Sequence, residues 1–309
     1  MRIAFSNFDD LNNPWYAGGG ARAIHEVARR LVSRHQVTAV TGNYPSARPA
    51  FVDGVAYKQI GAGWAGPRLG QLIYGLLLPL AARRTPHDVW VESLTPPFST
   101  GMLPWFTKCP VVALTQILGG LGMRQKYGLP FDRIERLGIR HYRYAIALSE
   151  VLKRQLLGMN AKLEVEVIPN GVPDQLIARI PKKTDRHVLF LGRLDRRHKG
   201  LDLLLQAWAA MPDNSPPLVV AGSGSQDETS WLERHPLVAA GKVTLTGRVS
   251  GDAKLQLMDE ALYLVMPSRY EGFPLVLPEA FCHALPVVLY SIPELSWLPE
   301  DCCVKLPPF

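Results

Sequence analysis

The sequence predicts an α/β protein built from two doubly wound, mainly parallel sheets, one in each half of the chain. Its 309 residues suit two domains, because a single hydrophobic core usually stops growing at about 250 residues. Short apolar runs alternate with helical patterns in both halves, which is typical of parallel strands joined by crossover helices. Residues 169–186, which combine prolines with charged side chains, separate the two series and are expected to form a linker.

The first series predicts a domain over residues 1–168. It opens with an apolar run at residues 2–8, which a glycine run and a helical pattern over residues 25–32 follow. Further strand candidates lie at residues 37–41, 89–92, 111–115 and 145–149. This order of strand, loop and helix is that of an open α/β sheet.

The second series predicts a domain over residues 187–309. Its strand candidates lie at residues 188–191, 218–221, 243–246, 263–266 and 286–289, with helical spans between them. Open sheets of this kind bind ligands at the carboxyl ends of their strands. The residues directly after each strand are therefore the first candidates for a functional site.

The overall charge favours anionic partners. A formal net charge of +7 suits a phosphorylated small molecule, a nucleic acid or an acidic membrane face. The basic residues are not interleaved with aromatic ones along a stripe, so no nucleic-acid partner is expected. The four cysteines form no C-x-x-C pair, and neither a metal site nor a disulfide framework is predicted. The first residues lack the basic start and apolar stretch of a secretory signal, so the cytoplasm is the expected location.

A basic segment bordered by glycines follows the strand at residues 188–191. It begins with Gly192-Arg193 and ends with Lys199-Gly200, and a helical pattern comes next. Glycines let the backbone approach a ligand, a helix N-terminus offers unpaired N–H groups, and the two side chains supply full positive charge. The segment predicts a cradle for a diphosphate; a solvated basic loop is the alternative.

Two carboxylates stand eight positions apart after the strand at residues 263–266. Glu271 is expected in the loop after that strand and Glu279 one to two turns into the next helix, so that both can point to one site. Carboxylates in such a place suit sugar hydroxyls, from which they accept paired hydrogen bonds. A helix-capping glutamate and a surface glutamate are the alternative, which the Gly-Phe-Pro loop between them makes less favoured.

Two glycine-rich turns carry weaker information. The turn at Gly222-Ser223-Gly224 follows a strand, and most such turns are merely turns. Gly18 to Gly20, with Ala23, loosely match the fingerprint of a dinucleotide site, yet they lie too far beyond the first strand, and the second strand lacks the ribose-binding acid. A dinucleotide site is therefore rejected, and a glycine loop facing a phosphate remains.

Together these segments resemble glycosyltransferase family 4, the retaining enzymes of the GT-B fold. The resemblance covers nearly the whole chain and depends on the order of its motifs. These are Gly18 to Gly20 before a helix, Ser149 before a helix, Ile168-Pro169-Asn170-Gly171-Val172, Gly192-Arg193 with Lys199-Gly200, Gly222-Ser223-Gly224, Gly247-Arg248-Val249, and Glu271 to Glu279. The resemblance implies two Rossmann-like domains that face a cleft, with the donor bound by the C-terminal one.

The resemblance also implies a role for each candidate residue. The reaction would move a hexose-type sugar from a nucleotide diphosphate to an acceptor sugar or lipid-linked sugar, in the synthesis of cell-envelope polysaccharide or glycolipid. Its catalytic residues would be Arg193 and Lys199 on the diphosphate and Glu271 on the transferred sugar. The other donor contacts would come from Gly18, Gly19, Gly20, Gly192, Arg248, Val249, Phe273, Pro274 and Glu279, the last of which would hold the ribose. No metal or cofactor is implied, because the cations neutralise the leaving diphosphate.

Two departures from the family pattern leave alternatives open. Many members place a histidine near the reacting sugar, after the strand matching residues 111–115, where this chain has Gln116; an amide can bond a hydroxyl but carries no charge. The family also continues beyond the position of Glu294, so the donor domain is expected to be incomplete at its end. A catalytically inactive protein that binds a nucleotide sugar or a partner is the second hypothesis, and a sugar-nucleotide epimerase is the weakest.

The most apolar stretch, residues 69–82, includes Pro79 and is shorter than the ~20 residues of a membrane span. With Arg83 and Arg84 behind it, this stretch predicts a helix that brings the first domain to an anionic membrane face, where a lipid-linked acceptor would lie. A helix buried in the core is the alternative. Membrane contact would place the protein at the inner face of the cell membrane.

Overall fold

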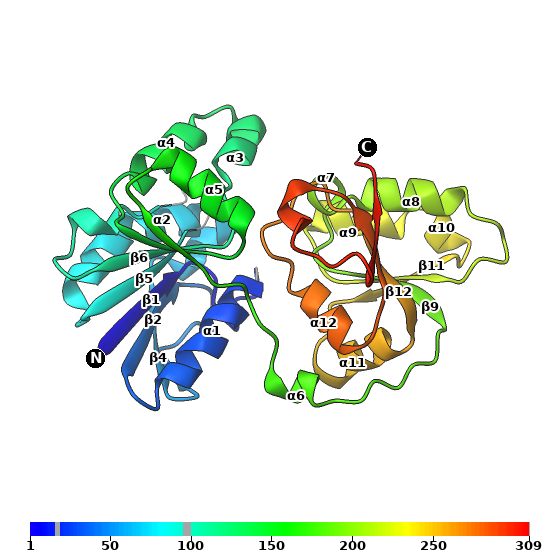
Figure 1. Cartoon of the computed structure of the whole chain (residues 1–309), viewed down its shortest axis with the longest axis horizontal. Helices are drawn as coiled ribbons and strands as arrows, with labels where there is room; N and C mark the ends of the chain where they lie inside the picture. The colour runs from blue at the N-terminus through cyan, green and yellow to red at the C-terminus, as the bar shows by residue number, and fades with distance from the viewer. Residues whose placement is uncertain (16–18, 95–99, 309) are drawn as a thin grey trace. The chain divides into compact units, whose positions relative to one another are not determined.

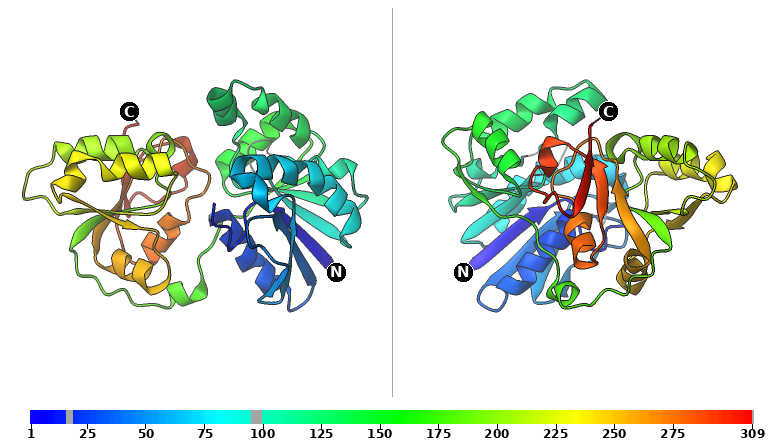
Figure 2. Two further views of the ribbon diagram at one scale, coloured as in Figure 1. Left: turned by 180° about the vertical axis from the view of Figure 1, so that it is seen from behind. Right: turned by 45° about the vertical axis from the view of Figure 1, so that its right-hand side comes forward.

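The computed structural model describes residues 1–15, 19–94 and 100–308 of the chain (Figure 1). The chain divides into two compact units, unit 1 (Met1–Asn170) and unit 2 (Gly171–Phe309). Each unit is a mainly parallel sheet with helices packed on it, which Figure 2 shows from two further directions. The predicted α/β class with two doubly wound sheets is therefore confirmed.

In the described part of unit 1, the strands follow the order β3-β4-β2-β1-β5-β6-β7-β8. They are β1 (Arg2–Asn7), β2 (Gln36–Gly42), β3 (Ala50–Val52), β4 (Val55–Ile60), β5 (Val89–Leu94), β6 (Val111–Thr115), β7 (Tyr144–Ala147) and β8 (Glu164–Val167). Neighbours pair in parallel, except that β3 and β4 form a hairpin. The chain leaves β1 for β2 on one side and later reaches β5 on the other, so the switch point of this sheet lies between β1 and β5.

Helices connect these strands. They are α1 (Gly19–Leu31), α2 (Gly66–Arg84), α3 (Gly120–Tyr127), α4 (Phe131–Ile139) and α5 (Glu150–Met159), with the 3-10 turns η1 (Gly63–Ala65) and η2 (Leu103–Trp105). α1 packs Ile24 and Ala28 against Phe5 of β1 in one apolar cluster. The Ser149 hydroxyl accepts the N–H of Leu152 and so caps α5, which is why β7 ends two residues before the predicted strand end.

In the described part of unit 2, the strands follow the order β11-β10-β9-β12-β13-β14, all in parallel. They are β9 (His187–Leu191), β10 (Leu218–Ala221), β11 (Val243–Gly247), β12 (Ala261–Met266), β13 (Val287–Tyr290) and β14 (Cys303–Leu306). The chain leaves β9 for β10 on one side and returns to β12 on the other. The switch point, where open sheets bind their ligands, therefore lies between β9 and β12.

The helices of unit 2 cover both faces of its sheet (Figure 1). They are α6 (Asp174–Ile177), α7 (Arg196–Lys199), α8 (Leu201–Ala209), α9 (Gln226–Glu233), α10 (Pro236–Ala239), α11 (Gly251–Asp259), α12 (Val276–Cys282) and the 3-10 turn η3 (Pro293–Leu295). Successive residues of a strand point to opposite faces. Accordingly Phe190 packs with Leu201 and Leu205 of α8, while its neighbour Leu189 packs with Leu277 of α12.

Every predicted strand is present, with its ends moved by at most two residues, but β3, β4, β8 and β14 were not predicted. β8 alternates glutamate with valine and leaves its glutamates exposed, so it lacks the apolar run of a central strand. The β3–β4 hairpin turns at Asp53-Gly54, both with positive φ (50° and 81°). An Asp-Gly turn between apolar runs was a usable hairpin signal in the sequence.

Candidate functional site

The loop after β9 folds against the loop after β12 because of one glycine. Gly200 has a φ of 68°, and a Cβ at this position would lie 2.0 Å from the carbonyl oxygen of Pro267. Only a residue without a side chain permits that approach. The helix expected from Leu201 is confirmed as α8, but the short α7 before it was not predicted. Asp195 accepts the N–H of His198 and caps α7, which ends at Lys199.

The close approach brings two predicted catalytic residues into contact. Nζ of Lys199 lies 2.5 Å from Oε1 of Glu271. The two side chains are 17% and 5% exposed, so the pair is largely removed from water, and each charge depends on the other for compensation. The ion pair fixes a cation and a carboxylate at the carboxyl ends of β9 and β12.

Arg193, the third predicted catalytic residue, lies in the same loop and is 55% exposed. Its Nη2 lies 2.6 Å from Nδ1 of His198 and 3.5 Å from Oδ2 of Asp195. On the other side of the ring, Nε2 of His198 lies 2.9 Å from the carbonyl oxygen of Tyr270. Burial of the imidazole, with Lys199 next in importance, lowers the pKa of His198 to about 4.

Glu279 is held by a different cation. Its Oε2 lies 2.6 Å from Nζ of Lys254 in α11, and the two side chains are 15% and 18% exposed. Glu279 lies in the first turn of α12, nearer to its start than expected. Glu271 and Glu279 therefore each pair with a lysine, and neither is the exposed glutamate of the alternative interpretation.

The remaining donor candidates of unit 2 are partly enclosed. The Phe273 ring is stacked on Trp297, with centroids 4.6 Å apart and planes 8° from parallel, and the next residue, Pro274, is buried. Val249 packs against the core at half burial, and its neighbour Arg248 is exposed. The side chain of Arg248 is thus in the solvent, and its backbone follows the end of β11.

The turn at Gly222 to Gly224 has a structural role. A Cβ on Gly222 would lie 1.8 Å from the carbonyl oxygen of Gly192, and one on Gly224 would lie 2.5 Å from that of Leu194. The N–H of Leu194 also donates to the carbonyl oxygen of Ser223 at 2.9 Å. The turn after β10 therefore supports the backbone on both sides of Arg193.

In unit 1 the structure brings Gly20 and Gln116 together. A Cβ on Gly20 would lie 3.8 Å from Cδ of Gln116, so Gly20, near the start of α1, lies against the residue after β6. Within the part of the chain that the structure describes, Nε2 of Gln116 and the hydroxyl of Thr115 are buried and lack a hydrogen-bond partner. Buried polar groups without partners are rare and point to a water or a ligand. Gly19 begins α1, and Gly18 lies outside the described residues.

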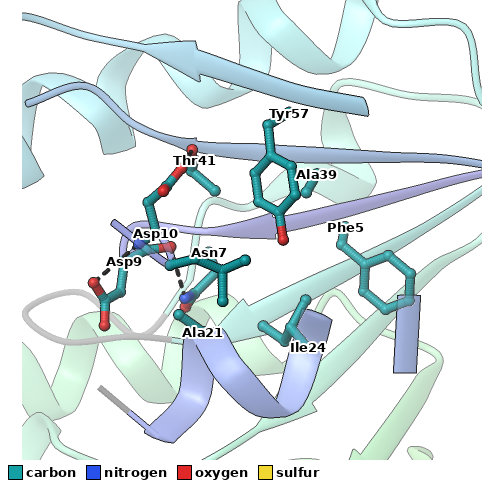
Figure 3. A pocket seen from close by; sticks show the side chains of 10 residues that line it. Phe5, Asn7, Asp9, Asp10, Ala21, Ile24, Ala39, Thr41 and Tyr57 are labelled. Carbon is teal, nitrogen blue, oxygen red and sulfur yellow. Dashed lines mark hydrogen bonds between the residues drawn. The ribbon is translucent and has the colours of Figure 1, made fainter. Parts of the chain in front are cut away.

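A small cavity lies beside β1, β2 and α1 (Figure 3). It is a poorer candidate for a ligand site than the residues after β9 and β12. Asp10 on its wall accepts hydrogen bonds from the Thr41 hydroxyl at 2.8 Å, the Tyr44 hydroxyl at 3.2 Å and the Gln59 amide at 3.2 Å. Its volume of about 10 Å³ leaves room for roughly one water molecule. The carboxylate is thus used to join strands of the sheet.

The described ranges contain no helix that is both long and apolar enough to cross a membrane. Over the same residues, His, Cys, Asp and Glu side chains form no group of three or more able to hold a metal ion.

Sequence reasoning missed four residues of this region: His198, Tyr270, Lys254 and Trp297. His198 sits in a run of basic residues, where nothing distinguishes the imidazole from its neighbours. Lys254 and Trp297 reach their partners from other elements, α11 and the segment after η3. No spacing along the chain indicates such contacts.

Two family models match the chain: Glycosyltransferase Family 4 over residues 17–176 and Glycosyl transferases group 1 over residues 185–301. Among curated proteins, an uncharacterized glycosyltransferase of Methanocaldococcus jannaschii is 36% identical over 111 residues, which is 35% of this chain and 28% of that protein. The phosphatidyl-myo-inositol mannosyltransferase of Mycolicibacterium smegmatis is 33% identical over 154 residues, which is 46% of this chain and 38% of that protein. These matches span about a third of each relative's length.

Solved structures share the fold. Sucrose-phosphate synthase from Thermosynechococcus elongatus gives a TM-score of 0.78 at 19% identity, covering 100% of this chain and 86% of that chain. HepE from Anabaena, in complex with UDP-glucose, gives 0.73 at 17% identity, covering 99% and 86%. These likenesses show the predicted GT-B fold. With its motifs in order, its two parallel-sheet units and both family models matched, the chain belongs to glycosyltransferase family 4.

Proposed function

We propose that the chain is a retaining, metal-independent glycosyltransferase that moves a hexose-type sugar from a nucleotide diphosphate to an acceptor. The observation that carries the proposal is the placement of Arg193, Lys199 and Glu271 at the switch point of unit 2, after β9 and β12. Two cations beside a carboxylate suit a diphosphate joined to a sugar. Membership of the family and the UDP-glucose complex of HepE support a nucleotide-sugar donor.

The cations would act mainly on the transition state. When the bond between the anomeric carbon and the diphosphate oxygen breaks, negative charge grows on the diphosphate. Arg193 and Lys199 would bind that growing charge more strongly than the ground state, and this difference lowers the barrier. Lys199 pairs with Glu271; with donor bound, the lysine would turn to the diphosphate and the carboxylate would accept from the sugar hydroxyls.

Glu279 would bind the ribose of the donor. A carboxylate that accepts hydroxyl hydrogen bonds gains roughly 1.5 to 3 kcal/mol per bond, and Lys254 keeps this one in place at 2.6 Å. We therefore expect Glu279→Ala to weaken nucleotide binding and to leave the fold intact. Isothermal titration calorimetry measures the first and circular dichroism the second. Nucleotide binding equal to that of the parent would remove the ribose assignment.

The acceptor would be a sugar or a lipid-linked sugar bound by unit 1. The relative named as a phosphatidyl-myo-inositol mannosyltransferase supports an acceptor carried by a lipid, and this points to cell-envelope glycolipid or polysaccharide synthesis. Nε2 of Gln116, which is buried and has no hydrogen-bond partner among the described residues, would donate to a sugar hydroxyl there. Gln116 stands where many members of the family have a histidine, and its amide, unlike a protonated histidine, carries no charge.

The surface of α2 supports contact with a membrane. α2 buries Tyr74, Leu78, Ala81 and Ala82 on one side. Its other side carries the α2 leucine surface, defined as Leu69, Leu72, Leu76, Leu77 and Leu80, with exposed fractions from 37% to 80%. The helix is thus apolar on both sides, which is unusual for a helix that faces water on one of them. The alternative of a wholly buried helix is wrong for these leucines.

We propose that the α2 leucine surface contacts an anionic lipid bilayer. Arg68 lies at one end of α2 and Arg83 and Arg84 at the other, all exposed, and Trp64 just before the helix is 81% exposed. Apolar side chains bordered by arginines and an aromatic ring match the interface between acyl chains and anionic headgroups. The protein would then work from the cytoplasm at the inner face of the cell membrane.

Donor turnover tests the proposed function. The parent, Arg193→Ala and Lys199→Ala are incubated with UDP-, ADP- and GDP-linked hexoses and release of the nucleotide diphosphate is measured. We expect turnover by the parent and a loss of ~10² to 10³ in each variant. Arg197→Ala is the matched control, since it removes an exposed positive charge from the same segment. Nucleotide binding without turnover by the parent would favour the inactive binding protein, and parent-like variants would refute the diphosphate assignment.

A further inference from the structure

The Arg193 side chain is the most exposed of the three predicted catalytic residues. It is 55% exposed, against 17% for Lys199 and 5% for Glu271. A long, exposed arginine samples many rotamers unless a partner holds it, and it loses that freedom on binding a ligand. Its contribution to an anion site therefore depends on what holds it beforehand.

His198 provides that support. Nδ1 of the imidazole lies 2.6 Å from Nη2 of Arg193, and Nε2 lies 2.9 Å from the carbonyl oxygen of Tyr270. The His198 and Tyr270 rings are stacked, with centroids 4.1 Å apart and planes 4° from parallel. The imidazole thus joins the loop after β9 to the loop after β12 and presents one nitrogen to the arginine.

These contacts define the protonation of the ring. A guanidinium has only donors, so Nδ1 must accept from Arg193 with its lone pair. A carbonyl oxygen only accepts, so Nε2 must carry the proton and donate to Tyr270. The neutral imidazole with its proton on Nε2 meets both conditions, and the cationic ring and the other tautomer do not.

We propose that His198 is a positioning residue, which in this neutral form holds Arg193 ready for the donor diphosphate beside Lys199. The role rests on the proposed function, because it concerns the same diphosphate. A second proton on the ring would remove the acceptor at Nδ1 and set two cations against each other.

The surroundings of the ring favour its neutral form. Burial is the largest cause that lowers the pKa of His198, and Lys199 and Arg193 lower it further. Glu271 and Asp195 act in the opposite direction, yet the pKa still falls to about 4. These charged groups come from both loops that pack on the ring. Because the pKa of His198 is about 4, the ring stays neutral at neutral pH.

Three substitutions distinguish the role of the hydrogen-bond acceptor at Nδ1 from that of the ring stacked on Tyr270. His198→Phe keeps a flat ring for Tyr270 but has no acceptor, and His198→Asn puts an amide oxygen near the position of Nδ1. Arg193→Ala removes the side chain that is held. Affinities for UDP, ADP and GDP are measured by calorimetry for the parent, for each variant and for the double variant His198→Phe/Arg193→Ala.

We expect His198→Phe to bind the preferred nucleotide about tenfold more weakly and His198→Asn to stay within about threefold of the parent. Once Arg193 is alanine, His198→Phe should add no further loss, because its effect passes through the arginine. Parent-like binding by His198→Phe beside weakened binding by Arg193→Ala overturns this inference alone. Equal losses in both backgrounds also overturn it. A parent that binds none of the three nucleotides overturns the proposed function and this role with it.

The tautomer is tested without any nucleotide. Nitrogen NMR of the histidine-labelled protein at neutral pH should show the resonances of His198, identified by their absence in His198→Asn, with a proton on Nε2 and none on Nδ1. A cationic ring or the other tautomer contradicts the pairing with Arg193, whatever the protein binds.

Discussion

Removing the charge of Lys199 should destabilise unit 2 as well as weaken donor binding. Nζ of Lys199 lies 2.5 Å from Oε1 of Glu271, and the side chains are 17% and 5% exposed. In Lys199→Met the glutamate keeps its charge in a place with little water. Removing one partner of a buried pair costs ~3 to 5 kcal/mol, and the partial exposure of the lysine puts this pair at the lower end, about 3 kcal/mol.

A double variant separates the burial of charge from function. Lys199→Met/Glu271→Gln leaves no uncompensated charge, so most of the lost ~3 kcal/mol should return. Affinity for a nucleotide diphosphate should stay low, because the cation that meets the diphosphate is still missing. Urea denaturation measures the stability of the parent and both variants, and calorimetry measures their nucleotide affinity.

Arg197→Met is the matched control for this comparison. Arg197 lies in the same segment and is exposed, so its loss should change the free energy of unfolding by less than about 0.5 kcal/mol. A single variant Lys199→Met as stable as the parent would refute the reasoning. A double variant less stable than the single one would refute it as well.

Three further variants test other parts of the molecule. Gly200→Ala should destabilise unit 2 by more than ~2 kcal/mol, because its Cβ would lie 2.0 Å from a carbonyl oxygen at a φ of 68°. Thermal denaturation measures this effect, with Gly158→Ala, whose Cβ meets open space, as the control. Equal stability of the two variants would contradict the prediction. Leu76→Glu should reduce co-sedimentation with anionic vesicles without loss of thermal stability. The control Leu137→Glu, which also changes an exposed leucine, should leave co-sedimentation and thermal stability unchanged. Co-sedimentation of Leu76→Glu equal to that of the parent would contradict the membrane contact. Burial raises the pKa of Glu92 from 4.5 to about 7, so the folded state holds a proton that the unfolded state releases, and the stability that this adds below 4.5 is lost as pH rises through 7. The stability of the parent relative to Glu92→Gln, from urea denaturation, should therefore fall across this window, and a constant difference would show that the carboxyl is not protonated in the fold.

The sequence was sufficient for the central strands and for the residues after them. β9 from Val188 onward and β10 along its whole length are apolar, because helices cover both faces of the sheet. Such a continuous apolar run can be recognised in the sequence without knowing which helices pack on it. Gly192, Arg193, Lys199 and Glu271 could then be placed because ligands of such sheets gather at the carboxyl ends of the strands.

The sequence was not sufficient for contacts between elements or for the faces of an apolar helix. Lys254 pairs with Glu279 across two helices, and neither residue carries a signal for the other. In α2 leucines occupy both sides, so no periodicity separates the buried Leu78 from the exposed Leu76. The acceptor role of His198 depends on the hydrogen bonds that its two ring nitrogens make, which only the folded loops define.

We propose that the segment from Arg193 to Lys199 binds the diphosphate of a nucleotide sugar. The most direct measurement is the thermal stability of the parent, Arg193→Ala and Arg197→Ala with and without UDP, ADP and GDP. A nucleotide at ~100 times its dissociation constant should add ~2.7 kcal/mol of stability to the parent. We predict this gain for the parent and Arg197→Ala with at least one nucleotide, and little or none of it for Arg193→Ala. An equal gain in all three proteins, or no gain in the parent with any of the three nucleotides, would contradict the claim.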